Sequence, residues 1–223
     1  MRLQTYVKNN GRFTKSEVMT LQKDKKILVN DKVCNLSYNL KDSDVVTING
    51  TILEKETFSY YLYNKPKGVI CTNDKKVENS IVNYTKIDKR VYPVGRLDKD
   101  THGLIILTND NKLTHYVLES KEIDKEYIVV IDNDVTNDFL KKMEEPILIH
   151  GKPTIPAKVR KISNNSVSVI LQDGRYHEVR ALVKNAGARL VDLKRIRIGK
   201  ISLDFYDLAP GDYIEVFNLK DLL

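Results

Sequence analysis

The segment from Gly95 to Leu104 carries the densest set of side chains suited to chemistry in this chain. It reads Gly-Arg-Leu-Asp-Lys-Asp-Thr-His-Gly-Leu and continues into an apolar run, Leu-Ile-Ile-Leu. A carboxylate on a polar loop beside a rigid strand is held in place and still open to a ligand. Arg96 precedes Asp98 by two residues, and a nearby cation favours the ionised carboxylate. Asp98 is therefore a candidate catalytic carboxylate. An aspartate that caps a turn is the alternative, and the loop alone leaves it open.

Other kinds of chemistry find little support in the residue pattern. The four histidines are not paired at metal-ligand spacings, and there is no glycine-rich nucleotide loop. Cys34 and Cys71 form no metal or redox spacing, so we interpret them as reduced thiols of a cytoplasmic protein. No apolar run has membrane-spanning length, and the opening MRLQTYVKNN lacks the apolar stretch of a signal peptide. We expect a cytoplasmic protein with no membrane contact, no metal and no cofactor.

Basic residues gather in two parts of the chain. Residues 1–41 carry nine Lys and Arg against three Asp and Glu, and residues 175–200 carry eight against two, so each cluster has a net charge of +6. Because the whole chain has a net charge of +7, the remaining residues sum to −5. Two basic clusters on a slightly acidic body favour a polyanionic partner. The alternative is a lysine-rich surface that is merely solvated.

The elements that must position these side chains fall into two parts, residues 1–56 and 57–223. In the first part, residues 3–7 place apolar side chains at helical spacing, and Thr14 or Ser16 can cap a second helix. The segment ILVNDKV predicts a strand, a tight turn and a second strand, and VVTING predicts a third. The first part is therefore expected to be a small helix-and-strand domain.

The second part mixes strands and short helices. The β-rich runs are YYLYN, GLIILTND, EYIVVI and SVSVILQ. The helical patterns are KLTHYVLES, VTNDFLKKMEE and YHEVRALVKNAG, with Gly187 as the expected C-terminal cap of the last. Because they do not alternate regularly, the pattern predicts an α+β domain built on a largely antiparallel, mixed sheet.

Both parts resemble a known family. Residues 1–50 resemble the S4 RNA-binding domain, on the opening MRL, the basic second helix and the strand pair around VNDKV. GRLDKDTHGLIILTND is similar to the central motif of the RsuA/RluB/RluE/RluF family of bacterial ribosomal pseudouridine synthases. NKPKG, KEY, GRYHEVR, RIRIGKISLD and LAPGDYIEV resemble its other motifs in the expected order. The chain is therefore identified as a member of this family, with an expected S4-like domain followed by a catalytic domain.

The resemblance implies roles for three residues. Asp98 matches the nucleophile of a reaction that breaks the uridine N1–C1′ bond, turns the uracil and rejoins it through C5. The carboxylate can bond to the sugar or remove a proton from C2′, and the sequence leaves both routes open. Tyr127 matches the tyrosine that stacks on the target base, with an ordinary core tyrosine as the alternative. Arg180 matches the basic residue paired with the carboxylate, with a solvated helix residue as the alternative.

Further residues are expected to contact RNA. They are Arg2, Arg12, Lys15, Lys23, Lys25 and Lys26 in the first part, and Lys65, Arg96, Arg175 and His177 in the second. Such cations bind phosphates and so position a protein without reading the base sequence. Family members often carry a second basic residue where this chain has Ala181, so no phosphate contact is expected there. His102 stands where small or acidic residues are common and receives no role.

GRYHEVR resembles the RsuA branch most, and that branch modifies 16S ribosomal RNA. The expected partner is therefore 16S ribosomal RNA or the assembling small subunit, bound by a monomer. A 23S ribosomal RNA synthase and a non-catalytic RNA-binding assembly factor are the alternatives. A glycosylase that uses Asp98 on a sugar is a further one, and it would release free uracil.

Overall fold

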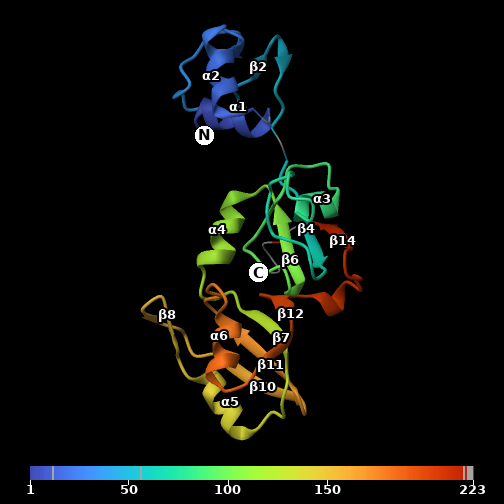
Figure 1. The fold of residues 1–223 in the computed structure, drawn as a ribbon. Coiled ribbons are helices and arrows are strands. Elements are labelled where there is room, and N and C mark those ends of the chain that lie inside the picture. The colour runs from blue at the N-terminus through green and yellow to red at the C-terminus, as the bar shows by residue number, and fades with distance from the viewer. Residues whose placement is uncertain (12, 56, 218, 220–222) are drawn as a thin grey trace. The chain divides into compact units, whose positions relative to one another are not determined.

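The computed structural model describes residues 1–11, 13–55, 57–217, 219 and 223. The chain divides into two compact units, Met1–Thr57 and Phe58–Leu223, which we call the N-terminal unit and the C-terminal unit (Figure 1). Within the described residues, no helix has the length and apolar character that crossing a membrane requires.

The N-terminal unit packs two helices on a small antiparallel sheet. Its elements are α1 (Leu3–Asn10), α2 (Lys15–Lys23), β1 (Ile27–Val29), β2 (Val46–Ile48) and β3 (Thr51–Ile52). Thr14 caps α2 in a reciprocal arrangement, because its hydroxyl accepts from the Glu17 N–H and the Glu17 carboxylate accepts from the Thr14 N–H at 2.6 Å. Leu3, Val7 and Val18 turn inward onto β1 and β2, so apolar burial joins the helices to the sheet.

The prediction of one strand in the N-terminal unit is wrong. Asn30 and Asp31 form the predicted tight turn, and both have positive φ values, of 48° and 62°. After the turn the chain makes only an isolated bridge, between Val29 and Lys32, instead of a strand. The regular partner of β1 is β2, which begins fifteen residues after Asp31. The side chains of Val46 and Ile48 in β2 point into the core.

The C-terminal unit holds the remaining elements. They are β4 (Tyr60–Lys65), α3 (Ile81–Thr85), β5 (Tyr92–Pro93), β6 (His102–Thr108), α4 (Asn111–Glu119), β7 (Lys125–Ile131), α5 (Asn137–Glu144), β8 (Leu148–Ile149), β9 (Lys152–Pro153), β10 (Lys158–Ser163), β11 (Ser166–Leu171), α6 (Glu178–Asn185), β12 (Leu190–Ile198), β13 (Ile201–Ser202), a 3₁₀ turn (Leu203–Phe205) and β14 (Tyr213–Val216). Helices α4, α5 and α6 coincide with the three helical patterns of the sequence. Ala186 is the C-cap of α6, and Gly187 follows it with a φ of 85°.

A mixed sheet runs through the C-terminal unit in the order β10-β11-β7-β12-β6-β4-β14, with β13 beside β12 and β5 beside β6. Its pairs are antiparallel except β6 with β12, which run parallel and align Gly103 with Arg195. The predicted α+β fold on a largely antiparallel, mixed sheet is therefore confirmed.

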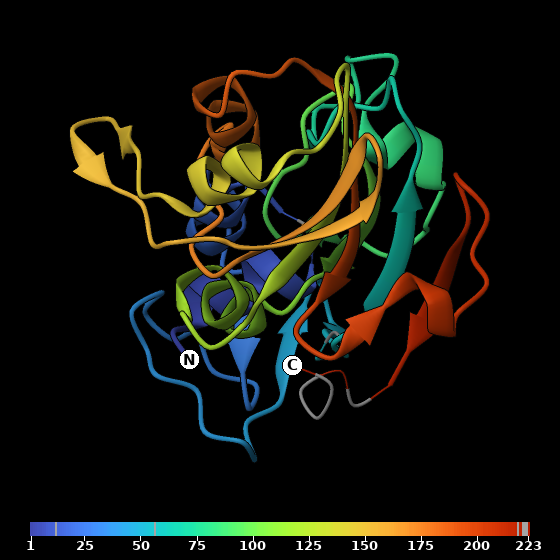
Figure 2. The same ribbon diagram turned by 90° about the horizontal axis from the view of Figure 1, so that it is seen from below.

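Apolar side chains cover both faces of the sheet. In β6, Ile105 and Leu107 belong to one core cluster, while Leu104 and Ile106 belong to the other, because successive side chains of a strand point to opposite faces. The first cluster includes the inward faces of α5 and α6, which lie near each other (Figure 1). The β8–β9 hairpin projects from the rest of the C-terminal unit in both views (Figure 1, Figure 2). Strand β6, buried on both faces, is the rigid support for the loop that precedes it.

Candidate active site

The loop between β5 and β6 carries Asp98, and buried contacts fix its shape. The Thr101 N–H donates to the Asp98 carbonyl at 3.1 Å, which closes a turn around the intervening residues. The Gly68 N–H donates to the Lys99 carbonyl at 2.8 Å. The Leu97 N–H donates to the buried Sγ of Cys71 at 3.4 Å. The segment after β4 therefore supports the Asp98 turn.

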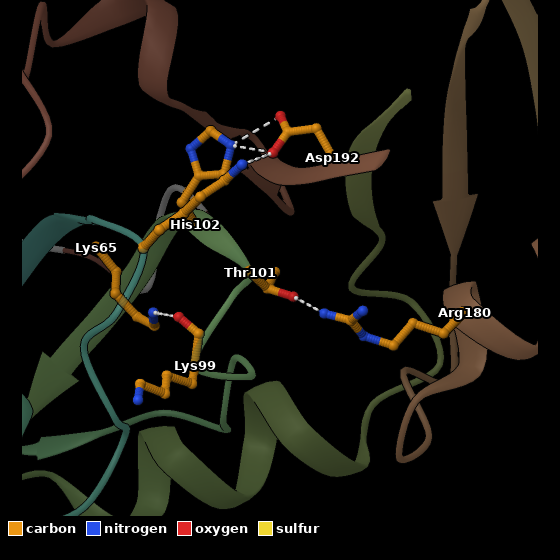
Figure 3. A network of polar contacts seen from close by, with 7 residues as sticks. Lys65, Lys99, Thr101, His102, Arg180 and Asp192 are labelled. Atoms are coloured by element: carbon orange, nitrogen blue, oxygen red, sulfur yellow. Dashed lines mark hydrogen bonds and ion pairs between the residues drawn. The ribbon is translucent and has the colours of Figure 1, made fainter. Parts of the chain in front are cut away.

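Asp98 meets two basic side chains at different carboxylate oxygens. Nε of Arg180 donates to Oδ2 at 2.8 Å, and Nε2 of His177 lies 3.2 Å from Oδ1. Nη2 of Arg180 also donates to the hydroxyl of Thr101 at 3.2 Å (Figure 3). The Asp98 side chain is 31% exposed, so a ligand can reach it. The arrangement gives an oriented and accessible carboxylate between two basic side chains, which is what a nucleophile or a base requires.

The start of α6 brings both basic side chains to Asp98. His177 is the N-cap of α6 and has a φ of 56°, in the left-handed region, where residues other than glycine are uncommon. Its ring stacks on that of Tyr176, with centroids 3.7 Å apart. Arg180 lies one turn into the helix. The left-handed backbone at the N-cap therefore places the His177 ring at the Asp98 carboxylate. The sequence pattern predicts that His177 contacts RNA.

Glu178 fixes this helix start from inside the protein. It is 2% exposed, and one carboxylate oxygen accepts from the Arg175 N–H at 2.7 Å. Its other oxygen, Oε1, has no hydrogen-bond partner among the described residues. Burial raises the pKa of Glu178, and the bond from Arg175 opposes that rise only in part.

Lys65 does not reach the surface, which overturns its expected contact with RNA. It is fully buried, and its ammonium donates to the carbonyls of Pro66 at 3.0 Å and Lys99 at 3.3 Å (Figure 3). Burial lowers the pKa of Lys65. Because the ammonium is bound to the backbone of the Asp98 turn, its role is to hold that turn.

The basic cluster of residues 175–200 is largely engaged inside the C-terminal unit, in contrast to the phosphate-binding surface that its charge suggested. Arg175 donates to Asp173 at 2.6 Å and to the Lys152 carbonyl at 2.9 Å. The other internally bonded arginines are Arg180 with Asp98, Arg189 with Asp132, Arg195 with the Leu104 carbonyl, and Arg197 with Glu126. Lys184 and Lys200 are exposed and remain available for phosphates.

Tyr127 and Arg96 lie in different environments. Tyr127 is 8% exposed and belongs to the apolar core on β7, next to Arg195 of β12. Only this small part of the residue is exposed in this structure. Arg96 is exposed on the loop before Asp98. Both positions are compatible with contact to a nucleotide brought to Asp98.

The expected RNA-binding residues of the N-terminal unit are exposed where the structure describes them. Arg2, Lys15, Lys23, Lys25 and Lys26 have exposed side chains. Lys26 lies 3.6 Å from Asp24, with both side chains about half exposed, so this pair leaves Lys26 free to exchange partners. Arg12 lies outside the described residues.

A second polar group lies beside the site and was not anticipated. His102 Nε2 lies 3.0 Å from a carboxylate oxygen of Asp192, and the Lys67 ammonium pairs with the other oxygen (Figure 3). Burial alone would raise the pKa of Asp192, but the hydrogen bonds from Lys67 and His102 outweigh burial and lower it. Asp192 and Lys67 line a pocket of about 240 Å³ together with Asp100, Arg180 and apolar residues of β12.

Sequence reasoning missed Thr101, Asp192 and Glu178, and nothing local marks the last two. Thr101 lies inside the conspicuous loop, so its closeness to Asp98 was a usable signal. Asp192 and its partner Lys67 are far apart in sequence and meet only through the parallel pairing of β6 with β12. Among the described residues, no group of three or more His, Cys, Asp and Glu side chains is placed to hold a metal ion.

Known proteins match the chain over most of its length. The sequence profile of the RNA pseudouridylate synthase family matches residues 59–185. The chain is 32% identical over 222 residues to an uncharacterized RNA pseudouridine synthase of Aquifex aeolicus, covering 97% of this chain and 92% of that relative. It is 33% identical over 236 residues to the ribosomal large subunit pseudouridine synthase B of Bacillus subtilis, covering 99% and 97%.

Two further likenesses agree. The dual-specificity RNA pseudouridine synthase RluF of Escherichia coli K12 is 30% identical over 229 residues, covering 98% of this chain and 79% of RluF. A crystal structure of a pseudouridylate synthase superposes with a TM-score of 0.68 at 27% identity, covering 99% of this chain and 97% of that one. Sequence and fold therefore lead to one conclusion: the chain belongs to the RNA pseudouridylate synthase family of enzymes.

Proposed function

We propose that this enzyme converts one uridine of ribosomal RNA into pseudouridine, with Asp98 as its catalytic carboxylate. The observation that carries the proposal is the Asp98 carboxylate, which is bound by Arg180 and His177 at separate oxygens and remains accessible. A non-catalytic RNA-binding protein gains nothing from a carboxylate at this place, because it repels phosphates.

The chemistry follows from the placement of charge. Breaking the N1–C1′ bond makes C1′ electron-poor, and a carboxylate oxygen close to it stabilises or traps that centre. Arg180 orients Asp98 and adds a positive charge beside it, and the Thr101 hydroxyl holds the guanidinium in place. The N1–C1′ bond breaks, the uracil turns, and a new bond forms between C5 and C1′; C5 then loses its proton and N1 takes one up. Uridine and pseudouridine have the same mass, so no group is imported.

Tyr127 and Arg96 serve the nucleotide in this proposal. A duplex or stacked loop hides C1′, so the target nucleotide must leave its stack before Asp98 can reach it. The small exposed part of Tyr127 supports the detached uracil, and Arg96 on the exposed loop binds the backbone phosphate. Base contact by an aromatic side chain keeps the uracil in place between bond breaking and bond formation.

The N-terminal unit is proposed to be an S4-like RNA-binding domain. Its exposed cations Arg2, Lys15, Lys23, Lys25 and Lys26 lie on and around two helices packed on a small sheet. Residues 1–56 would position the RNA through its phosphates, while residues 57–223 carry the chemistry.

For the target we propose 16S ribosomal RNA, free or within an assembling small subunit, acted on by a monomer in the cytoplasm. The support is the Gly174–Val179 segment, whose Tyr176 and His177 resemble the small-subunit branch and whose His177 reaches Asp98. A 23S ribosomal RNA target is the second candidate, because the Bacillus subtilis relative is named for the large subunit.

One experiment tests both the activity and the target. Transcripts of 16S and 23S ribosomal RNA are incubated with the protein, and pseudouridine is mapped by primer extension after carbodiimide treatment. We expect one new stop in 16S RNA with the wild-type protein, and no stop with Asp98→Asn, which removes the charge and keeps the shape. Affinity for the RNA should stay within about twofold, since Asp98 contributes no attraction to phosphate.

A matched control and two opposing outcomes complete the test. Asp88→Asn removes an exposed carboxylate outside the site and should leave the stop intact. Retained activity in Asp98→Asn would remove Asp98 from its role. A stop confined to 23S RNA would replace the 16S assignment and keep the activity.

A further inference from the structure

The pocket beside the catalytic carboxylate is lined by both charged and apolar side chains. The charged ones are Lys67, Asp100, Arg180 and Asp192, and the apolar ones are Leu190, Val191 and Leu193 of β12. Val191 is 56% exposed, so this apolar side chain is open to a ligand. Pockets for drug-sized molecules measure about 300–1,000 Å³, so a volume of about 240 Å³ suits a smaller, flat group such as one nucleobase.

The charged side chains of this pocket favour a ligand that donates a hydrogen bond over an anionic ligand. The two cations are already paired, Lys67 with Asp192 and Arg180 with Asp98. Asp100 makes no hydrogen bond or ion pair with another described residue, and it faces the same space. A phosphate would have to displace Asp192 or Asp98 from its cation and would also lie close to the carboxylate of Asp100. A base with an exocyclic amino group would give Asp100 a donor and lay its ring against Val191.

One side chain, that of Arg180, connects the pocket to the catalytic carboxylate. Arg180 lines the pocket and also donates to Asp98, so the guanidinium separates the two spaces. A nucleotide bound at Asp98 therefore places its chain neighbour close to the pocket. Since the target leaves its stack, the neighbouring base loses a stacking partner and becomes available to another surface.

From this geometry we propose that the pocket binds the base adjacent to the target uridine, and that Asp100 favours an adjacent base carrying an exocyclic amino group. The proposal rests on the proposed function and adds a rule for substrate choice. His102 and Lys67 hold Asp192 away from that base, because both of its oxygens are occupied. Adenine, guanine and cytosine satisfy Asp100, whereas uracil leaves it without an amino donor.

The test removes one amino group from the RNA. Short stem-loops containing the mapped uridine are made with adenosine, or with purine riboside, which lacks the amino group, on each side of the target in turn. We expect kcat/KM of the wild-type protein to fall about tenfold for purine riboside on one side only, the size expected for a hydrogen bond to a charged acceptor. In Asp100→Ala the two RNAs should react at the same rate. Guanosine and inosine give a second such pair.

The readout is the ratio of rates for the paired RNAs, so a general loss of activity in a variant does not disturb it. Val191→Trp narrows the pocket and should also bring the ratio toward one, whereas Ile162→Trp, at an exposed site of β10, should keep it. An unchanged ratio in Asp100→Ala, or equal rates for both RNAs with the wild type, would refute the pocket assignment alone. A wild-type protein that forms no pseudouridine in any RNA would remove the proposed function as well.

Discussion

Thr101 is the side chain through which the Asp98 turn holds Arg180. The residue is 2% exposed, and its hydroxyl accepts from Nη2 while Nε of the same guanidinium binds Asp98. Two hydrogen bonds fix the orientation of a guanidinium, whereas a single one lets the group rotate. The position of the Asp98 carboxylate therefore depends on a neutral hydroxyl three residues away.

Thr101→Val should lower kcat at least about tenfold with little change in KM, because it removes a hydrogen bond to a charged group that orients Asp98. Single-turnover rates of pseudouridine formation measure the effect. Thr108→Val is the matched control, since Thr108 is equally buried on β6 and its hydroxyl accepts from the Asp110 N–H. The control should lose stability and keep its rate. Equal rates in the two variants would show that Thr101 does not position Arg180.

Glu178→Gln should make stability less dependent on pH. The unfolded carboxyl titrates near its ordinary pKa of 4.5, and burial raises the folded value. Between these values the folded protein holds the extra proton, so wild-type stability is full below 4.5 and declines as pH rises through the folded pKa. The glutamine does not titrate, so its stability relative to wild type should rise across that window and level off above it.

Urea unfolding of both proteins at about pH 4 to 8 measures this difference. Glu122→Gln, at an exposed position, should show no such trend. A stability difference between Glu178→Gln and wild type that stays constant with pH would contradict a raised pKa in the folded state.

The residues of the site were predictable to the extent that chemistry marks them locally. Asp98 and Arg180 were expected as a pair through the family resemblance, and they form one. The burial of Lys65 could not be predicted, because a lysine at the end of a strand usually faces water. Only the fold shows that the carbonyls of Pro66 and Lys99 converge on it.

At the scale of elements, the parallel pairing of β6 with β12 is the contact that joins the loop of Asp98 to the pocket. Gly103 aligns with Arg195 in this pair and has a φ of 104°. A Cβ at Gly103 would overlap the backbone of Arg195. The two strands approach this closely only because the residue between them lacks a side chain.

Gly103→Ala should therefore lower the free energy of unfolding by about 3 kcal/mol or more, because it combines backbone strain with a clash inside the sheet. Gly151→Ala is the control, since its φ is also positive, at 75°, with nothing near the added methyl group. It should cost only about 1–2 kcal/mol. Chemical denaturation measures both, and similar losses would show that β6 and β12 can separate to admit the methyl group.

Helices were easier to predict than strands for a physical reason. The capping box of α2 and the apolar spacing of α6 are local and can be read in a few residues. Strand pairing is not local, so the expected strand after Asn30-Asp31 did not form and β2 took its place. The short β8–β9 hairpin has no apolar alternation and left no recognisable pattern.

At the scale of the whole molecule, formal charge overstates the surface available to RNA. The cluster of residues 175–200 is bonded internally through most of its arginines, whereas the described cations of residues 1–41 are exposed. A charge count from the sequence weights every cation equally. It cannot distinguish internally bonded cations from exposed ones, because tertiary contacts decide ion pairing. The N-terminal cluster should therefore supply more of the salt-dependent affinity.

Replacing Lys15, Lys23 and Lys25 together with glutamine should weaken RNA binding and flatten its dependence on salt. Each phosphate that the variant no longer neutralises should reduce the slope of log K against log salt by about 0.7 to 0.9. Fluorescence anisotropy over a range of salt concentrations measures the slope.

A variant with the same loss of charge elsewhere controls for net charge. Lys75, Lys112 and Lys141 are exposed lysines outside both clusters. Replacing them with glutamine should change the slope less. If the two triple variants have the same slope, the N-terminal unit does not bind the phosphates in the way proposed for it.

The sealed ammonium of Lys65 has a consequence for how the enzyme and its RNA adapt to each other. Opening the Asp98 turn would break that ammonium's bond to the Lys99 carbonyl and uncover the hydrophobic interior around it. Such a loop is a poor choice for a lid that closes over its substrate. Under the proposed function, the deformation then falls to the nucleic acid, which has to swing its uridine out toward a carboxylate that stands still.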